Sequence, residues 1–406
     1  MKIAISSPDG MGDFILRVPM ITALGEAGHK LQLFLREPAA SLAEVVFPEA
    51  ELNRIEADPY HHESRTKKNP FKREHRAIRR FRPDLYVASL FSLNFFDEVW
   101  IEWNRGHVPM AGFTTQEDFW TSGTIRKPGV IAEQFRIRVE VPVDLPELEK
   151  NRRLGSAILG VDLPEVMTRL SADSTSLQQA KNLLKKHGIE EGGYLVACVG
   201  GRSGLRMKDW GEKNWRRFFE SIYSSDGRPV LFLGNAKEAE SIERIRSSAF
   251  RSVNLSLAPP PIRVSLALAS LSSGYVGRDS GVMHMAAAVG RPVLAAYGGG
   301  HWGRFFPSSG PAVVVSQSIS CRGCNFSCPH ERPHCITGIS MKTMLEGWRR
   351  LPDVHGVEVL EQEPDPKLDV IPVSEAHAFA MTCEADERTR VAKARSQGIF
   401  GRLFGR

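Results

Sequence analysis

Short apolar runs alternate with longer amphipathic stretches in the first part of the chain. Residues 2–6 and 30–35 are apolar runs that predict buried strands, and residues 13–27 between them predict a helix. Pro19 falls inside that helix, so we expect it to bend the helix or mark its first turn. Another buried strand is predicted over 84–90. This alternation is typical of a parallel sheet with helices on both faces.

A second strand–helix series follows a predicted linker. Residues 141–174 are rich in Pro, charge and short apolar pieces, which indicates linker behaviour. A helix is predicted over 175–187, and the strands after it are predicted at 194–199, 229–233, 253–257, 274–277 and 292–297. After Pro352 the rhythm fades into an acidic loop and a basic tail that we expect to be helical. The predicted domains are therefore 1–170, 171–352 with a cysteine-rich segment at 321–335, and an extension at 353–406.

Length and composition limit the class of protein. The 406 residues fit two domains, and 42% apolar with 25% charged residues is typical of a soluble globular protein. No apolar run approaches the roughly 18–20 residues of a membrane span, and the N-terminus does not resemble a signal peptide. We therefore expect a cytoplasmic protein. The net charge of +6 indicates an anionic partner, with nucleic acid, a membrane surface and a phosphorylated substrate all open.

The first candidate site is the glycine turn after the first strand. Gly10 and Gly12 allow tight backbone geometry, and Asp13 stands at the predicted start of the helix. An aspartate there can act as a general base for an acceptor hydroxyl. The alternative is a simple N-cap, which Asp fills well without any chemistry. The dinucleotide pattern G-x-G-x-x-G is absent.

The second candidate site is the glycine loop that closes the first strand of the second series. Val199-Gly-Gly-Arg-Ser203-Gly is followed by Arg206 and Lys208, and glycines, a hydroxyl and cations in this place suit a diphosphate. A solvated glycine loop is the alternative, and the P-loop order is absent. Glu238 follows another strand of the series, where a carboxylate can accept bonds from ribose hydroxyls.

The third candidate site is Asp279-Ser280-Gly281, with His284 one turn later. A strand, a short turn and a small-residue helix in this order direct a helix N-terminus at one place, where a phosphate binds well. Ser280 as an ordinary N-cap and His284 as a packed core histidine are the alternatives.

Four of the six cysteines lie within fifteen residues: Cys321, Cys324, Cys328 and Cys335. The C-x₂-C spacing suits tetrahedral thiolate ligation, for which zinc fits best and iron is second. Packed or partly oxidised thiols are the alternative. A closed site of four thiolates leaves no position for substrate, so the expected role is structural.

Taken together, the chain resembles the glycosyltransferase family 9 enzymes, the ADP-heptose:lipopolysaccharide heptosyltransferases and their relatives. The matching pieces are Gly12-Asp13-x-x-Leu16-x-x-Pro19, the Gly200–Trp210 loop, and Asp279-Ser-Gly-x-x-His284-x-Ala-Ala-Ala-x-Gly-x-Pro292. The resemblance implies an α/β protein of the GT-B fold, in which two Rossmann-like, doubly wound domains face each other across a cleft. It also implies inverting transfer from a nucleotide-sugar donor such as ADP-heptose, without a catalytic cofactor.

The resemblance also implies roles for individual residues. Asp13 is the expected base, and Lys208 the cation on the donor diphosphate. The remaining expected donor-binding residues are Gly12, Ser203, Arg206, Glu238, Asp279, Ser280, Gly281 and His284. The run Gly200-Gly-Arg and the extension past residue 350 depart from the family pattern, which leaves the acceptor open among a glycan, a lipopolysaccharide core and a protein hydroxyl.

Two alternatives to a transferase remain: a nucleotide-sugar epimerase on the same fold, and a non-catalytic protein that binds membranes or nucleic acid. The sequence shows no helix-turn-helix or RNP-like pattern, so we expect no nucleic-acid partner. Residues 65–82 carry nine Lys or Arg, and the tail combines Arg402 and Arg406 with apolar residues. These features predict peripheral contact with an anionic (inner) membrane, and a solvated charged helix with a frayed terminus is the alternative.

Overall fold

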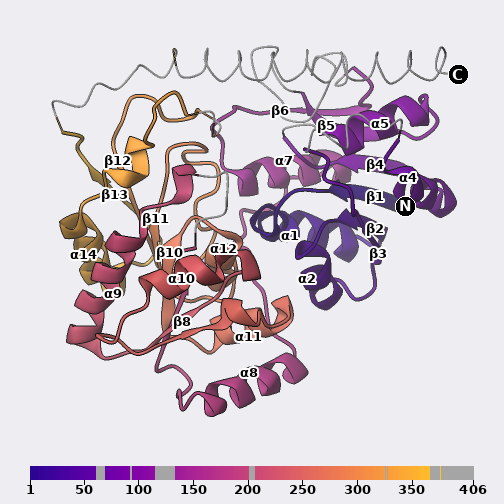
Figure 1. The fold of residues 1–406 in the computed structure, drawn as a ribbon. Helices are drawn as coiled ribbons and strands as arrows, with labels where there is room; N and C mark the ends of the chain where they lie inside the picture. The colour runs from indigo at the N-terminus through magenta and orange to yellow at the C-terminus, as the bar shows by residue number, and fades with distance from the viewer. Residues whose placement is uncertain are drawn as a thin grey trace, which may run out of the picture. The chain divides into compact units, whose positions relative to one another are not determined.

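The computed structural model describes residues 1–60, 69–91, 94–114, 133–200, 206–324, 326, 328–365 and 375 (Figure 1). The chain forms two compact units, an N-terminal unit that includes Met1–Val166 and a C-terminal unit of Met167–His377. The basic tail predicted to be helical lies outside the described residues.

The N-terminal unit is built on a six-stranded parallel sheet with the order β3-β2-β1-β4-β5-β6. Its strands are β1 Lys2–Ser7, β2 Lys30–Leu35, β3 Glu51–Arg54, β4 Leu85–Ala88, β5 Met110–Thr114 and β6 Ile137–Glu140. Its helices are α1 Met11–Glu26, α2 Ala39–Val46, α4 Lys72–Phe81, α5 Phe95–Asn104 and α7 Glu147–Leu159. Pro19 lies inside α1.

Helices cover both faces of this sheet, as the apolar runs predict. On one face, apolar side chains of α4 and α5 pack with residues of the central strands such as Ala4 and Tyr86. On the other face, α1 packs against α7. The apolar side of α4 predicted from Phe71, Ile78 and Phe81 is buried in the same way.

The predicted linker over 141–174 is wrong in its middle, where α7 is a 13-residue helix. Its composition is charged, so little in the local sequence favours a buried helix. Its burial depends on close approach to α1: a Cβ on Gly155 would lie only 3.0 Å from Met20 Cγ. Tertiary packing therefore decides the structure of this segment.

The C-terminal unit is built on a seven-stranded parallel sheet with the order β13-β12-β11-β10-β7-β8-β9. Its strands are β7 Leu195–Cys198, β8 Val230–Phe232, β9 Ser252–Asn254, β10 Gly274–Arg278, β11 Val293–Ala296, β12 Ala312–Gln317 and β13 Val357–Gln362. Its helices are α8 Ser174–Lys186, α9 Glu212–Asp226, α10 Ala239–Ile245, α11 Ile262–Ser270, α12 Gly281–Ala288, α13 His334–Thr337 and α14 Met341–Arg350. Short 3₁₀ turns are η1 Arg206–Lys208, η2 Ala236–Glu238, η3 Leu255–Leu257 and η4 Leu351–Asp353.

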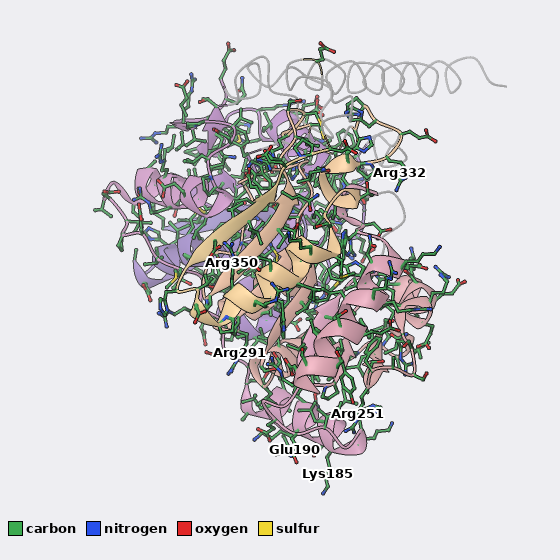
Figure 2. The ribbon with its side chains drawn as sticks, turned by 90° about the vertical axis from the view of Figure 1, so that its left-hand side faces the viewer. Lys185, Glu190, Arg251, Arg291, Arg332 and Arg350 are labelled. Carbon is green, nitrogen blue, oxygen red and sulfur yellow. The ribbon has the colours of Figure 1, made fainter. Side chains whose placement is uncertain are left out.

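Alternate residues of these strands face two separate cores, so this sheet is also doubly wound. One core joins the sheet to α9 and α14, and the other joins it to α8, α11 and α12. The helices α8 and α11 pack together at one end of the unit (Figure 1). Figure 2 shows Lys185 and Glu190 pointing outward at this end, where Arg251 donates to the carbonyl oxygens of His187 and Gly188.

The strand order reverses at one place in each sheet, and these places lie at β1/β4 and β7/β10. In open parallel sheets, ligands bind outside the carboxyl ends of the strands at such a switch point. Asp13 follows β1, the loop to Lys208 follows β7, and Asp279 follows β10. The motifs found in the sequence therefore lie where the topology favours binding.

The predicted extension at 353–406 also needs correction. Residues 357–362 form β13, which pairs in parallel with β12 and belongs to the sheet of the C-terminal unit. Its residues alternate between half-buried and exposed, as in an edge strand. The sequence predicts a loop here because the segment contains acidic residues. In the part of the chain that the structure describes, no helix is long and apolar enough to span a membrane.

Candidate active site

Asp13 lies in the first turn of α1, directly after β1. The N-cap of this helix is Gly10, and no side chain caps it, so Asp13 is the third residue of the helix and not its cap. A Cβ on Gly10 would lie 3.0 Å from Asp13 Oδ2, so the glycine leaves room for the carboxylate. Asp13 is half-buried, and the helix N-terminus favours its negative charge.

A buried ion pair supports the same turn. Arg17, one helical turn after Asp13, donates from Nη2 to Asp9 Oδ2 over 2.7 Å and from Nη1 to Ser7 Oγ. Burial acts against the charge of Arg17, but Asp9 and then Asp13 outweigh it and raise the pKa of Arg17 above its ordinary value. The cation nearest in sequence to Asp13 is thus held by Asp9.

Tyr60 is a further residue near this turn that sequence reasoning missed. Burial, and then the charges of Asp9 and Asp13, raise its pKa well above the ordinary value. No local pattern links Tyr60 to residue 13. Arg17 did have a signal, because it is a charge between the buried residues Leu16 and Val18.

In the C-terminal unit, Lys208 and Asp279 form an ion pair across the switch point. Lys208 Nζ lies 2.6 Å from Asp279 Oδ2, and the two side chains are 18% and 8% exposed. The pair joins the end of η1 to the residue that follows β10. An ammonium group carries three N–H donors, so Lys208 keeps donor capacity for a phosphate beside this carboxylate.

Ser280 is the N-cap of α12, as the simpler alternative predicted. Its Oγ accepts from the backbone N–H of Met283 over 3.3 Å and lies 3.1 Å from the Tyr275 hydroxyl. Gly281 is the first helical residue. The first-turn N–H groups of an α-helix have no intrahelical acceptor, so this end of α12 still favours an anion.

His284 is buried in the first turn of α12, within electrostatic reach of the same pair. Burial lowers its pKa to about 4, against the opposing charge of Asp279. The imidazole is therefore neutral at pH 7. Its Nδ1 has no hydrogen-bond partner among the described residues.

Glu238 is held by a second ion pair, to Arg278. Glu238 Oε1 accepts from Arg278 Nη2 over 2.6 Å, and Oε2 accepts from the backbone N–H of Asn235 over 2.9 Å. The carboxylate therefore ties the loop after β8 to the end of β10. Its predicted contact with ribose stays a prediction and would use the remaining lone pairs of these oxygens.

Two predicted donor residues are described incompletely or not at all. Ser203 lies outside the described residues, and Arg206 is described by its backbone as the first residue of η1.

Arg278 is a site residue that sequence reasoning missed. The sequence did mark it, because it is a charged residue in the otherwise apolar run before Asp279.

The four cysteines are free thiols gathered after β12. Cys321, Cys324 and Cys335 are buried and pack with Ile319, and Cys328 is half-buried. Burial, and then the neighbouring cysteines, raise the pKa of Cys324 to about 12, so its thiol is protonated at pH 7. Among the described residues, no group of three or more His, Cys, Asp or Glu is arranged to hold a metal ion. The predicted structural metal therefore gains no support from this geometry.

Two doubly wound parallel α/β units, each with its candidate residues at the carboxyl edge of the sheet, are the two domains of a GT-B fold. The family model for glycosyltransferase family 9 (heptosyltransferase) matches residues 121–331, just over half of the chain. The chain therefore belongs to glycosyltransferase family 9. This assignment confirms the predicted family and enzyme class.

Solved structures share the fold at low sequence identity. The chain is similar to a family 9 glycosyl transferase from Veillonella parvula, with a TM-score of 0.66, 15% identity and coverage of 86% of this chain and 96% of that one. It is similar to E. coli ADP-heptose lps heptosyltransferase II, with a TM-score of 0.61, 16% identity and coverage of 86% and 98%. It is also similar to E. coli heptosyltransferase WaaC with ADP, with a TM-score of 0.54, 16% identity and coverage of 94% of this chain and 99% of that one. No curated protein matches the sequence.

Proposed function

We propose that this enzyme transfers a heptose from ADP-heptose to a hydroxyl of a glycan, a lipopolysaccharide core or a protein, with inversion at the anomeric carbon. The observation that carries the proposal is the Lys208–Asp279 pair at the switch point of a family 9 chain. Similar folds include heptosyltransferases solved with ADP and with an ADP-heptose analogue. The family assignment favours transfer over the epimerase and over a non-catalytic binding protein.

The proposed chemistry is a single displacement. Asp13 removes the proton of the acceptor hydroxyl, whose oxygen then forms the new bond to the anomeric carbon. The bond from that carbon to the diphosphate oxygen breaks, and its electron pair leaves with the nucleoside diphosphate. Lys208 and the N-terminus of α12 stabilise the departing charge. The reaction needs no catalytic cofactor, because these groups supply the base and the leaving-group stabilisation.

Calorimetric titration with nucleotide sugars tests the donor. We expect ADP-heptose and ADP to bind, and UDP- and GDP-sugars to bind at least about tenfold more weakly, a difference of about 1.4 kcal/mol. A UDP- or GDP-sugar that binds more tightly than ADP-heptose would replace the proposed donor. Failure of every nucleotide sugar and nucleoside diphosphate to bind would contradict the assignment of the C-terminal unit.

We propose a cytoplasmic location and peripheral contact with an anionic membrane, and the basic face of α4 supports the membrane contact. Its exposed residues are all cationic: Lys72, Arg73, Arg76, Arg79 and Arg80, while its one acid, Glu74, is buried. Arg82 continues this surface as the C-cap of the helix. Each basic residue near an anionic bilayer contributes about 1 kcal/mol of attraction.

For the cysteine-rich segment we propose that packed thiols fix the loop after β12, with the predicted zinc or iron ion as the alternative. Burial beside Ile319 supports packing. Metal analysis of protein purified under reducing conditions without chelator separates the two. We expect far less than one ion per chain, and about one zinc or iron per chain would restore the metal site.

A further inference from the structure

Two aromatic side chains stand beside Lys208 at the carboxyl edge of the C-terminal sheet. His301 follows β11, Phe326 follows β12, and their ring centroids are 4.3 Å apart. Lys208 Nζ lies 5.1 Å from the centroid of the Phe326 ring. Both residues are half-buried, so each keeps part of its surface exposed.

The position of Phe326 is built by several independent features. Its backbone has φ of 64°, which is uncommon for a bulky residue and costs free energy, so it persists only where the surroundings enforce it. A Cβ on Gly300 would lie 2.5 Å from Phe326 Cδ1, so the glycine makes the space that the ring occupies. The segment that carries Phe326 begins and ends in the cluster of Cys321, Cys324 and Cys335.

A second contact fastens the same segment to the loop after β11. Arg322 stacks on Trp302, with Cζ 3.8 Å from the ring centroid, and the backbone N–H of Gly323 donates to Gly299 oxygen over 2.8 Å. The loop after β11 and the loop after β12 are therefore held together, and they carry His301 and Phe326 respectively. An aromatic surface held so firmly at a half-exposed position is suited to contact a ligand.

The strand order gives this surface its place along the donor. Neighbouring strands run β8, β7, β10, β11 and β12, and the residues after their carboxyl ends are, in that order, Glu238, Lys208, Asp279, His301 and Phe326. A donor laid across this edge with its diphosphate at Lys208 and Asp279 has two ends. If the ribose lies toward Glu238, the transferred sugar lies toward the aromatic pair.

We propose that His301 and Phe326 form the subsite for the transferred sugar, whose C–H face packs on the Phe326 ring. The inference rests on the proposed function, because it takes the diphosphate position from Lys208. The ligand class is a pyranose attached to a nucleoside diphosphate. Such packing contributes to the affinity for the nucleotide sugar and does not contribute to the affinity for the nucleoside diphosphate alone.

Paired titrations of Phe326→Leu with ADP and ADP-heptose test this subsite. We expect the dissociation constant of ADP-heptose to rise about fivefold to tenfold, as for loss of one aromatic contact, and that of ADP to change less than about twofold. His301→Ala should show the same selectivity. Phe250→Leu is the control, because Phe250 packs on Phe219 and Phe232 in the core of the same unit.

Two results would overturn the subsite. Equal weakening of ADP and ADP-heptose would show that the ring acts only through Lys208, and unchanged affinity for both would leave Phe326 a packing residue. Thermal unfolding of each free variant shows whether it is folded, and His301→Ala carries the test if Phe326→Leu is not. A wild-type protein that binds neither ligand would instead contradict the proposed function itself.

Discussion

The two units use the same kind of sheet edge in different ways. In the N-terminal unit, Ser7, Asp9, Asp13 and Arg17 all come from one strand–helix turn. In the C-terminal unit, the edge is assembled from loops after several strands, joined by the Lys208–Asp279 and Arg278–Glu238 pairs. Substitutions in the local site therefore affect residues that are close in the sequence, whereas substitutions in the assembled site affect residues far apart in the sequence.

The largest expected effect separates chemistry from binding at the local site. Asp13→Asn keeps the shape of the side chain but removes the base, so turnover should fall by roughly two to four orders of magnitude. Donor affinity, measured by calorimetry, should stay within about twofold because the proposed diphosphate site, at Lys208 and Asp279, belongs to the other unit. Glu26→Gln, at the exposed far end of α1, is the control. Near-normal turnover would leave Asp13 a helix residue without a catalytic role.

The next effect concerns the pH dependence of stability that buried His284, in the first turn of α12, produces. Its folded pKa of about 4 lies below the ordinary 6.5, so the unfolded chain binds a proton first as the pH falls. The stability that neutral His284 contributes is therefore complete above pH 6.5 and lost between pH 6.5 and 4, by about 3 kcal/mol. Urea unfolding at pH 7 and pH 4 should show a smaller loss in His284→Gln. An identical pH dependence in the variant would contradict this origin.

The N-terminal unit should respond less over the same pH range. Burial lowers the pKa of His75 to about 3, which costs stability on acidification in the same direction. Burial also raises the pKa of Asp97 to about 6, so the folded unit takes up this proton before the unfolded chain does and gains stability as the pH falls below 6. Peptide-resolved pepsin digestion at pH 4 should cut the C-terminal unit first. Earlier cleavage of the N-terminal unit would reverse the comparison.

The next effect concerns Lys208, the cation proposed to bind the donor diphosphate. Lys208→Ala should weaken ADP and ADP-heptose together, by about tenfold to a hundredfold, since a charged hydrogen bond contributes about 1.5–3 kcal/mol. Lys237→Ala removes an exposed lysine of the same unit and should change neither affinity. If Lys208→Ala binds ADP as the wild type does, the diphosphate lies elsewhere.

The smallest effect concerns the outer face of the N-terminal unit. Arg80→Gln should weaken binding to vesicles with anionic phospholipid about fivefold at low salt, as expected for one basic residue near a bilayer. Lys185→Gln, on α8 of the other unit, should have no effect (Figure 2). Equal flotation of the wild type with neutral and anionic vesicles would rule out this contact.

The difference between the two edges also explains what the sequence could predict. Strand Lys30–Leu35 was predicted at its observed bounds because four of its six residues are apolar, as expected for a strand that is covered on both faces. The turn with Asp13 was found because all its parts are adjacent in sequence. The two ion pairs of the C-terminal edge were not, since Lys208 meets Asp279 only through the neighbouring positions of β7 and β10.

Helix α7 and strand β13 were missed for a related reason. Charged residues are interspersed among the apolar ones in both elements, and each is fixed by packing or pairing with a distant element. Phe326 carried no signal at all. Its proposed role depends on the cysteines that flank it and on Gly300 and Lys208, which come from two other parts of the chain.

Release of nucleoside diphosphate is the most direct test of the central claim that the enzyme transfers a sugar from a nucleotide donor. The wild type is incubated with ADP-heptose, with and without a lipopolysaccharide-core or glycan acceptor, and ADP is measured over time. We predict ADP release that depends on acceptor, equals the sugar transferred and is lost in Asp13→Asn. An epimerised nucleotide sugar, or ADP released at the same rate without acceptor, would contradict the account.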